Sequence, residues 1–394
     1  MTHAERRAVI SGIGQSQVGR RLGRDELDLT LDAALEAIAD AGLAVADIDG
    51  LATYPGGIGG YPGYTGPGSP AVQDALRLSL NWHSGGVEGP AQIQAVINAV
   101  MAVAVGLARH VLVYRTVTES TAQGTGGRPG IGTGDTAVDG PNQWTIPFRA
   151  YSAANWLALY AQRHFHEFGT TEQQMAQIAL NARRNAALNP KAVFREPLSI
   201  DDYMAARIVS SPFRLYDCDV PVDGSVALVV SAVQHARDVD HPVAQVQAVG
   251  AALRGRPSWE HWDDLTTMPA RTSAAQMWSR TDLRPADVDV AEIYDGFSWL
   301  TMSWLEALGF CGHGESGPFI EDGTRIARDG EIPVNTHGGQ LSAGRLHGYG
   351  YLHEAVLQLR GEAGERQVPG IPEVAVVSNG GGPISGCMLL SKLT

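Results

Sequence analysis

The chain has 394 residues, of which 44% are hydrophobic and 18% are charged. This composition is typical of a globular protein with a sizeable core, and the length suffices for two domains. The net charge of −13 argues against a nucleic acid or an anionic membrane as the main partner. No run approaches the ~20 apolar residues of a membrane helix, and the first residues enter a strand pattern without the apolar core of a signal peptide. We therefore expect a soluble, cytoplasmic protein.

The residue counts also exclude some kinds of chemistry. The three cysteines, Cys218, Cys311 and Cys387, lack CxxC spacing, so neither a disulfide framework nor a cysteine zinc site is indicated. The two lysines are Lys191, in a loop-like stretch, and Lys392, close to the end. A Schiff-base enzyme needs a desolvated lysine on a rigid element. Neither lysine meets this requirement.

Strand and helix patterns alternate through the first 240 residues. The patterns predict strands at 7–14, 47–54 and 110–117, a strand pair at 214–233, and helices at 25–41, 89–107, 150–168 and 171–188. Two glycine-rich segments, 55–70 and 120–140, are predicted as loops. The second is long enough to suggest a lid or a binding loop.

The remaining residues repeat the same alternation. Strands are predicted at 242–253 and 286–295, a strand pair at 373–392, and helices at 273–280, 297–308 and 348–360. Two halves of this kind predict an α/β fold, with residues 1–240 and 241–394 as two similar domains.

Four segments of the second half carry candidate functional residues. They are "AEIYDGFS" around Tyr294, "PVNTHGGQLSAGRLHGYG" from Pro333, "LRGEAGERQV" from Leu359 and "SNGGGPISG" from Ser378. A phenol at a strand end can serve packing or chemistry. Backbone N–H groups of successive glycines can point at a developing oxyanion. Each segment alone is readily structural, but their occurrence in this order is specific.

Together with the runs at 9–20 and 212–230, these segments resemble the thiolase superfamily. The resemblance is strongest to the branch that contains the thiolase of sterol carrier protein x and its bacterial lipid-transfer relatives, and it covers essentially the whole chain. It implies two βαβαβαββ halves in a five-layer arrangement, usually assembled as a dimer, that act on acyl-CoA thioesters. Coenzyme A would then enter as part of the substrate, with no other cofactor and no metal.

The sequence departs from the thiolase pattern at the residues that carry thiolase chemistry. Gly86 lies nearest the place of the nucleophilic cysteine, and Ser378 stands where the second cysteine is expected. Tyr294 replaces the strand-end histidine, and Arg345 replaces the Gly-His-Pro histidine, so His347 is the nearest imidazole. Acyl transfer cannot proceed without a thiolate or an equivalent nucleophile. The site is therefore either inactive or rebuilt.

A tyrosine in place of that histidine resembles the bacterial thiolase-like retro-aldolases of steroid side-chain breakdown. The resemblance implies cleavage of a 17-hydroxysteroid 20-carboxyl-CoA to a 17-ketosteroid and propionyl-CoA. It also implies a companion, the OB-fold and zinc-ribbon protein (domain of unknown function 35) of the steroid acyl-CoA hydratase, which would make the dimer a heterotetramer. Two alternatives remain open: a non-catalytic acyl-CoA or lipid carrier, and a thiolase-like enzyme that acts on another β-hydroxyacyl-CoA.

The resemblance assigns the catalytic roles to phenols and an imidazole. Tyr294 is the expected proton acceptor, Tyr349 or Tyr351 a second phenol for the enolate or the hydroxyl, and His347 a possible donor. A phenol has a reference pKa of ~10. Tyr294 can therefore act as a base only if proton transfer is concerted with cleavage, or if a cation such as Arg345 lowers its pKa. Packing remains an alternative role for each of these four aromatic side chains.

The remaining candidates are expected to bind the substrate. The N–H groups around Gly381 and Gly382 would face the thioester oxygen, and Arg345 and Ser378 would line the same site. A charged Asp295 close to Tyr294 would raise the pKa of the phenol. We therefore expect Asp295 to turn away or to hold another residue in place.

Overall fold

The computed structural model describes residues 3–54, 63–85, 92–125, 143–236, 239, 241–253 and 264–393. Gly86 and much of the two glycine-rich segments lie outside these ranges, so the prediction of a lid or binding loop at 120–140 is left open. Within the described ranges, no helix is both long enough and apolar enough to cross a membrane.

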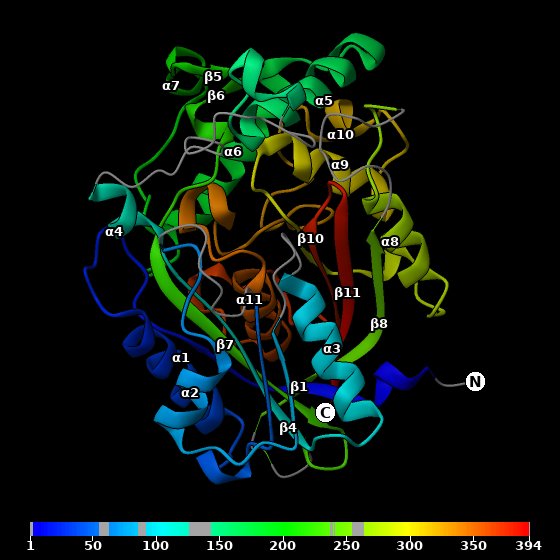
Figure 1. Cartoon of the computed structure of the whole chain (residues 1–394). Helices are drawn as coiled ribbons and strands as arrows, with labels where there is room; N and C mark the ends of the chain where they lie inside the picture. Colours follow the sequence, from blue (N-terminus) through cyan, green and yellow to red (C-terminus); the bar gives the residue numbers. More distant parts are fainter. Residues whose placement is uncertain are drawn as a thin grey trace.

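One nine-stranded sheet runs through the molecule in the order β3-β2-β4-β7-β1-β8-β11-β10-β9 (Figure 1). Its strands are β1 (Ala8–Gln15), β2 (Gly50–Thr53), β3 (Trp82–Gly85), β4 (His110–Thr118), β7 (Asp223–Ala232), β8 (Val243–Leu253), β9 (Val290–Glu292), β10 (Val374–Gly380) and β11 (Ile384–Leu393). The central strands are apolar runs buried on both faces, as expected where helices cover both sides. A small separate sheet pairs β5 (Ile208–Ser210) with β6 (Phe213–Arg214).

The sheet consists of two halves with the same strand order. From the centre outward, the first half runs β1, β7, β4, β2, β3 and the second runs β8, β11, β10, β9. The pairings also match: the first two neighbours in each half are antiparallel, and the next is parallel. The counterpart of β3 is reduced to a single parallel bridge between Ala291 and Val334. The halves join where β1 pairs with β8.

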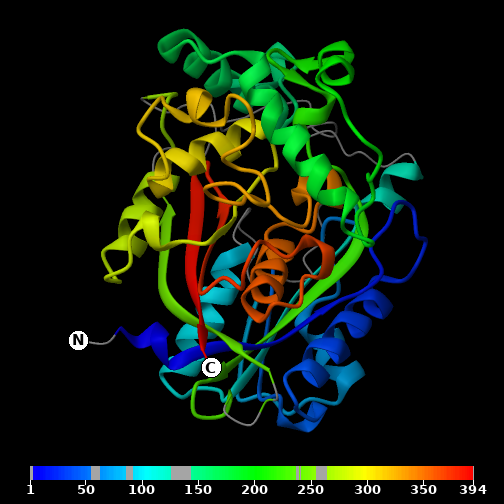
Figure 2. The ribbon, with the colours of Figure 1, turned by 180° about the vertical axis from the view of Figure 1, so that it is seen from behind.

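Helices form three layers around this sheet. The main helices are α1 (Glu26–Asp40), α2 (Ser69–Leu76), α3 (Gln92–Ala104), α5 (Ala153–Phe168), α6 (Glu172–Ala187), α8 (Ala270–Trp278), α9 (Ser298–Leu308) and α11 (Tyr349–Arg360). Helices α3 and α11 contact strands of both halves, so they form a middle layer that the sheet encloses (Figure 2). Helix α1 covers the outer face of the first half, and α8 covers that of the second.

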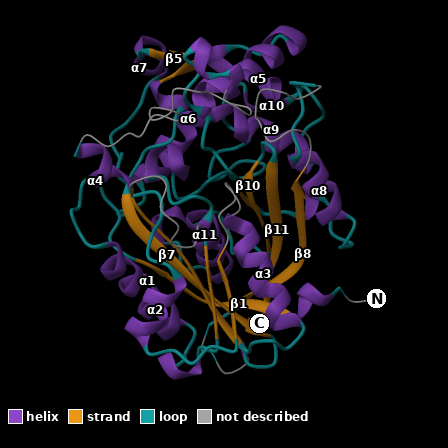
Figure 3. Ribbon diagram, viewed as in Figure 1, coloured by secondary structure: helices purple, strands orange, loops and turns teal. Residues whose placement is uncertain are grey.

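A long insertion separates β4 from β7. It contains α5, α6 and the short helices α4 (Glu119–Gly124) and α7 (Ile200–Ala205), and it lies over the end of the sheet where β10 and β11 turn (Figure 3). Helix α10 (Ser316–Ile320) comes from the second half and packs against α6. The insertion thereby places residues of the first half next to the strand ends of the second.

Most of the predicted elements are confirmed, with local corrections. The strand predicted at 286–295 is only three residues long, because the chain turns away at Ile293 toward Asn335. The first strand predicted within 214–233 is instead a 3-10 turn (Leu215–Asp217) followed by irregular backbone. The glycines of the first strand have a packing role. A Cβ at Gly12 would lie 2.2 Å from the Ala37 carbonyl oxygen, so glycine lets α1 approach β1 closely.

Candidate functional site

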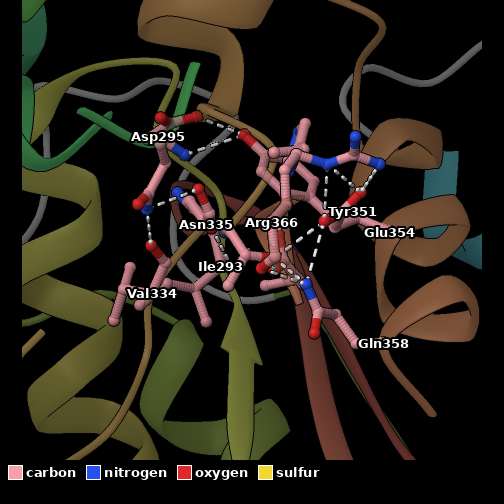
Figure 4. A network of polar contacts seen from close by, with 12 residues as sticks. Ile293, Asp295, Val334, Asn335, Tyr351, Glu354, Gln358 and Arg366 are labelled. Carbon is pink, nitrogen blue, oxygen red and sulfur yellow. Dashed lines mark hydrogen bonds and ion pairs between the residues drawn. The ribbon is translucent and has the colours of Figure 1, made fainter. Parts of the chain in front are cut away.

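Tyr294 lies in the short connection between β9 and α9. Ile293, which precedes Tyr294, makes two hydrogen bonds with the side chain of Asn335. Oδ1 accepts the Ile293 N–H at 2.7 Å, and Nδ2 donates to the Ile293 carbonyl at 2.8 Å (Figure 4). The Tyr294 N–H donates to Ser378 Oγ at 3.2 Å. Ser378, predicted as a substrate-binding residue, therefore anchors the Tyr294 backbone.

The loop that carries Asn335 is itself fixed by helix α6. Asn181 and Asn185 each donate to the Val334 carbonyl at 3.0 Å, and Asn185 also reaches the Asn335 carbonyl at 3.1 Å. Asn335 has φ of +51°, a conformation that asparagine tolerates better than most residues. The strand end that presents Tyr294 is thus positioned by buried side-chain amides from two other elements.

Arg345 is enclosed by two carboxylates from the insertion. Its Nε and Nη2 bind both oxygens of Glu119 at 3.0 and 2.8 Å, and its Nη1 binds Asp219 Oδ1 at 3.0 Å. Burial raises the pKa of Asp219 to about 6, although Arg345 opposes the rise. This cluster carries one net negative charge when all three groups are ionised.

Tyr294 lies beside this cluster and is 8% exposed. The Asp219 N–H donates to the Gly296 carbonyl at 3.2 Å, and a Cβ at Gly296 would lie 3.1 Å from the Tyr294 hydroxyl oxygen. Burial first, and then the Asp219 charge, raise the pKa of Tyr294, whereas Arg345 works in the opposite direction. The net shift is upward. Arg345 therefore acts on the pKa of Tyr294 in the predicted direction, but burial and the Asp219 charge outweigh it, so the surroundings favour the alternative of concerted proton transfer.

Asp295 holds another residue in place, which is one of the two arrangements predicted for it. Its Oδ1 accepts hydrogen bonds from the Tyr351 hydroxyl and from the Gln340 N–H, the latter at 2.7 Å, and the Asp295 N–H donates to the same hydroxyl at 3.1 Å. Burial raises the pKa of Asp295. A Cβ at Gly339 would lie 1.9 Å from Asp295 Oδ2, so glycine is required there. Tyr351 is thus occupied by a structural bond.

His347 is a buried, neutral imidazole. Arg115 Nη2 donates to its Nδ1 at 3.0 Å, which places the proton of the neutral ring on Nε2. Burial and the charges of Arg115 and Arg345 hold the pKa of His347 well below its usual value. Its φ of +49° is uncommon for histidine. His347 can therefore serve as a hydrogen-bond donor, but not as a cationic acid.

Tyr349 and the glycine turn differ in whether their predicted donors already make a hydrogen bond. Tyr349 is fully buried, and its hydroxyl has no hydrogen-bond partner among the described residues. The Gly381 N–H instead donates to the Ile384 carbonyl at 3.3 Å, within the turn that joins β10 to β11. The Gly381 N–H is thus used within the hairpin. Gly382 is the next residue of the same turn. Of the predicted donors, Tyr349 has the clearest unused capacity.

Three residues of the site were missed from the sequence: Asp219, Gln340 and Arg115. Asp219 and Gln340 lie in segments that carry the resemblance, but their residue types gave no separate signal. Arg115 falls inside a strand pattern and is nevertheless fully buried, with its guanidinium 4.8 Å from the ring centre of Tyr64 and 5.5 Å from that of Tyr54. A charged residue in the middle of an apolar strand run could have indicated this buried site residue.

The chain is similar to two proteins whose names describe the cleavage of steroid compounds. It is 35% identical to the steroid side-chain-cleaving aldolase of Thermomonospora curvata, over 97% of each chain. It is 34% identical to the 17-hydroxy-3-oxo-4-pregnene-20-carboxyl-CoA lyase of Mycobacterium tuberculosis, over 97% of this chain and 98% of that one. Residues 250–390 match a family model described as thiolase C-terminal domain-like.

Solved structures confirm the predicted thiolase-like fold. The Ltp2-ChsH2(DUF35) aldolase superposes with a TM-score of 0.87 at 33% identity, over 98% of both chains. Human mitochondrial 3-ketoacyl-CoA thiolase superposes with a TM-score of 0.67 over the full length of both chains, and at 13% identity this likeness concerns the fold alone.

Removal of the hydroxyl should have different effects on protein stability at the two tyrosines of α11. Tyr351→Phe deprives the buried Asp295 carboxylate of a partner and should lower the free energy of unfolding by about 1–3 kcal/mol. Tyr349→Phe removes a hydroxyl that lacks a partner in the described structure, so the stability should be unchanged or slightly raised. Urea denaturation of both variants measures the difference. Equal destabilisation would contradict these assignments.

Proposed function

Because this chain belongs to the thiolase superfamily, in the group that contains the steroid side-chain-cleaving aldolases, we propose that it catalyses a retro-aldol cleavage. The substrate is a 17-hydroxysteroid 20-carboxyl-CoA, and the products are a 17-ketosteroid and propionyl-CoA. The observation that carries this proposal is Tyr294, a buried phenol beside the Arg345-bound Asp219 carboxylate, in a site whose sequence lacks the thiolase cysteines.

The first step removes the proton of the tertiary hydroxyl. Tyr294 is a neutral phenol because burial raises its pKa, so it accepts this proton only while it passes its own proton on. Asp219 receives that proton, since Arg345 binds only its Oδ1 and its pKa of about 6 leaves it ionised at neutral pH. As the proton leaves, the carbon–carbon bond between Cα and Cβ breaks and the former hydroxyl oxygen becomes the ketone oxygen.

The electron pair of the broken bond moves into the thioester as an enolate. The enolate oxygen needs preorganised donors in a dry site. His347 supplies Nε2–H, and the Tyr349 hydroxyl supplies a second donor. Cα then takes up one proton, which balances the proton that Asp219 received and later releases, and propionyl-CoA is formed. This route requires neither a Schiff base nor a metal, since the thioester itself is the electron sink.

The assembly is proposed on the same grounds. The solved aldolase that this chain resembles, Ltp2-ChsH2(DUF35), is named for two proteins, of which ChsH2(DUF35) is the second. We expect this chain to bind an OB-fold and zinc-ribbon companion of that kind, and to form a dimer that becomes a heterotetramer with it. Co-purification of the two proteins, followed by light scattering, tests both expectations.

Product analysis separates the proposed function from its alternatives. The chain, with and without the companion, is incubated with a 17-hydroxysteroid 20-carboxyl-CoA, and propionyl-CoA and the 17-ketosteroid should appear in equal amounts. Tight acyl-CoA binding without any product would favour a carrier. Product formation only from a non-steroid β-hydroxyacyl-CoA would favour the third alternative.

Tyr294→Phe should abolish cleavage while leaving the fold intact. The hydroxyl is the proposed proton acceptor, so the rate should fall by a factor on the order of 100 to 10,000, with an unchanged far-UV spectrum. Leu159→Ala, an exposed side chain of α5, is a control that should retain the wild-type rate. A Tyr294→Phe variant with full activity would remove Tyr294 from the mechanism.

The pH profile should report Asp219. Its carboxylate accepts a proton only when ionised, so kcat/KM should rise with pH and level off above about 6, the pKa to which burial raises this group. Asp219→Asn should lower the plateau and remove this acid limb. An unchanged acid limb in the variant would assign the titration to another group.

A further inference from the structure

The backbone of Gln340 is held by two hydrogen bonds, to residues that are chain neighbours of Tyr294 and of Asp219. Its N–H donates to Asp295 Oδ1 at 2.7 Å, and its carbonyl accepts the Val220 N–H at 3.0 Å. Val220 follows Asp219, and Asp295 follows Tyr294 in the chain. Gln340 itself belongs to a π-helical turn, Gly339–Ala343, a conformation that occurs frequently at functional sites. The turn therefore holds Gln340 between the proposed base and the proposed acceptor of its proton.

The side-chain amide of Gln340 has a defined orientation and an unused donor. Its Oε1 accepts the His347 N–H at 3.0 Å, which fixes the oxygen on that side and leaves Nε2 on the other. The residue is 2% exposed, and within the described part of the chain Nε2 has no hydrogen-bond partner. A buried amide N–H without a partner is unfavourable, because it has lost its hydrogen bond to water. An acceptor atom of a bound ligand, or an ordered water in its absence, would satisfy this donor.

The direction of this donor is toward Tyr294. A side-chain interaction of hydrogen-bond type from Gln340 lowers the pKa of the Tyr294 phenol, against the larger effects of burial and of the Asp219 charge. Nε2 therefore lies near the phenol, although it makes no hydrogen bond of standard geometry with it. An amide acts in this way when its N–H dipole points at the phenol oxygen. An oxygen atom of a ligand placed against the Tyr294 hydroxyl would therefore also lie near Gln340 Nε2.

We propose that Gln340 is a further catalytic residue, whose Nε2–H donates to the tertiary hydroxyl oxygen of the substrate while Tyr294 takes its proton. This inference rests on the proposed retro-aldol function and deepens it. The substrate hydroxyl would donate to Tyr294 and accept from Gln340, so both of its hydrogen-bonding directions are specified. A site built in this way selects β-hydroxyacyl-CoA thioesters over the corresponding acyl-CoA thioesters that lack the hydroxyl.

The variant Gln340→Glu isolates the donor. A carboxylate keeps an oxygen for the His347 N–H but cannot donate from the Nε2 position. Cleavage should fall on the order of 100-fold or more, and the preference for a β-hydroxyacyl-CoA over its deoxy analogue, measured by calorimetry, should fall more than tenfold. Exchange of the C2 protons of propionyl-CoA with deuterium oxide depends on the enolate donors and should stay within about threefold of wild type.

Gln276→Glu is the matched control. Gln276 Oε1 also accepts a backbone N–H, that of Ala251 at 2.7 Å, but this side chain lies on the exposed face of α8. It should bind and cleave as the wild type does. Should Gln340→Glu fail to fold, Gln340→Met is measured in its place by the same criteria.

Two results would overturn the assignment. One is cleavage within about threefold of wild type with the hydroxyl preference intact. The other is loss of deuterium exchange in proportion to loss of cleavage, which would place Gln340 at the enolate or in the scaffold. The binding comparison needs no turnover, so it tests Gln340 even if the wild-type chain does not cleave the steroid substrate. Failure of the proposed function and failure of this inference are thereby distinguished.

Discussion

The pairing of Arg345 with Glu119 and Asp219 is the constraint on which the site depends. Glu119 begins the insertion and Asp219 lies near its end, whereas Arg345 belongs to the second half, so one guanidinium joins both ends of the insertion to the loop that precedes α11. Three charged side chains that are only 10–19% exposed are unfavourable unless they are paired. Removal of Arg345 would leave two uncompensated carboxylates beside Tyr294, whereas removal of either carboxylate would leave a neutral pair. These charges can therefore be removed from solvent only when the two halves are correctly positioned at this point.

The same cluster limits how Tyr294 could act as a base in the proposed reaction. Its excess negative charge and the burial of the site both favour the neutral form of Tyr294, so a resting phenolate is excluded by the electrostatics of its own surroundings. What the surroundings do provide is a carboxylate whose pKa of about 6 is far above that of an exposed aspartate. Such a carboxylate is ionised at neutral pH and still basic enough to take a proton from a phenol that is receiving another. Burial, which disables Tyr294 as a lone base, is also what makes Asp219 a competent partner.

The sequence predicted the fold well because its signals are local or carried by the resemblance. The helix over 25–41 forms because Asp25 caps it, its side chain accepting the Leu27 N–H, and Gly42 ends it. Tyr294 was found because it stands where a histidine was expected. Asp219 and Gln340 were not, because their roles arise from contacts between segments far apart in the chain, and an aspartate or glutamine in a loop has no distinguishing pattern. The assignment between Tyr349 and Tyr351 was equally beyond the sequence: both lie in the first turn of one helix, and only the position of Asp295 shows which hydroxyl is already bonded.

During a retro-aldol cleavage, negative charge moves from the hydroxyl oxygen to the thioester oxygen. The charged groups proposed for the two ends of the site differ accordingly. The hydroxyl oxygen ends as a neutral ketone, so a neutral amide such as that of Gln340 is sufficient there, and a cation would hold back the alkoxide from collapsing. The thioester oxygen gains the charge, and on that side Arg115 donates to His347. Within the described ranges Arg115 has no carboxylate partner, and it is covered by the rings of Tyr54 and Tyr64. In the proposed reaction, the charge of Arg115 would therefore act on the enolate through the imidazole that it polarises, and Cα would stay basic enough to take the proton that completes the reaction.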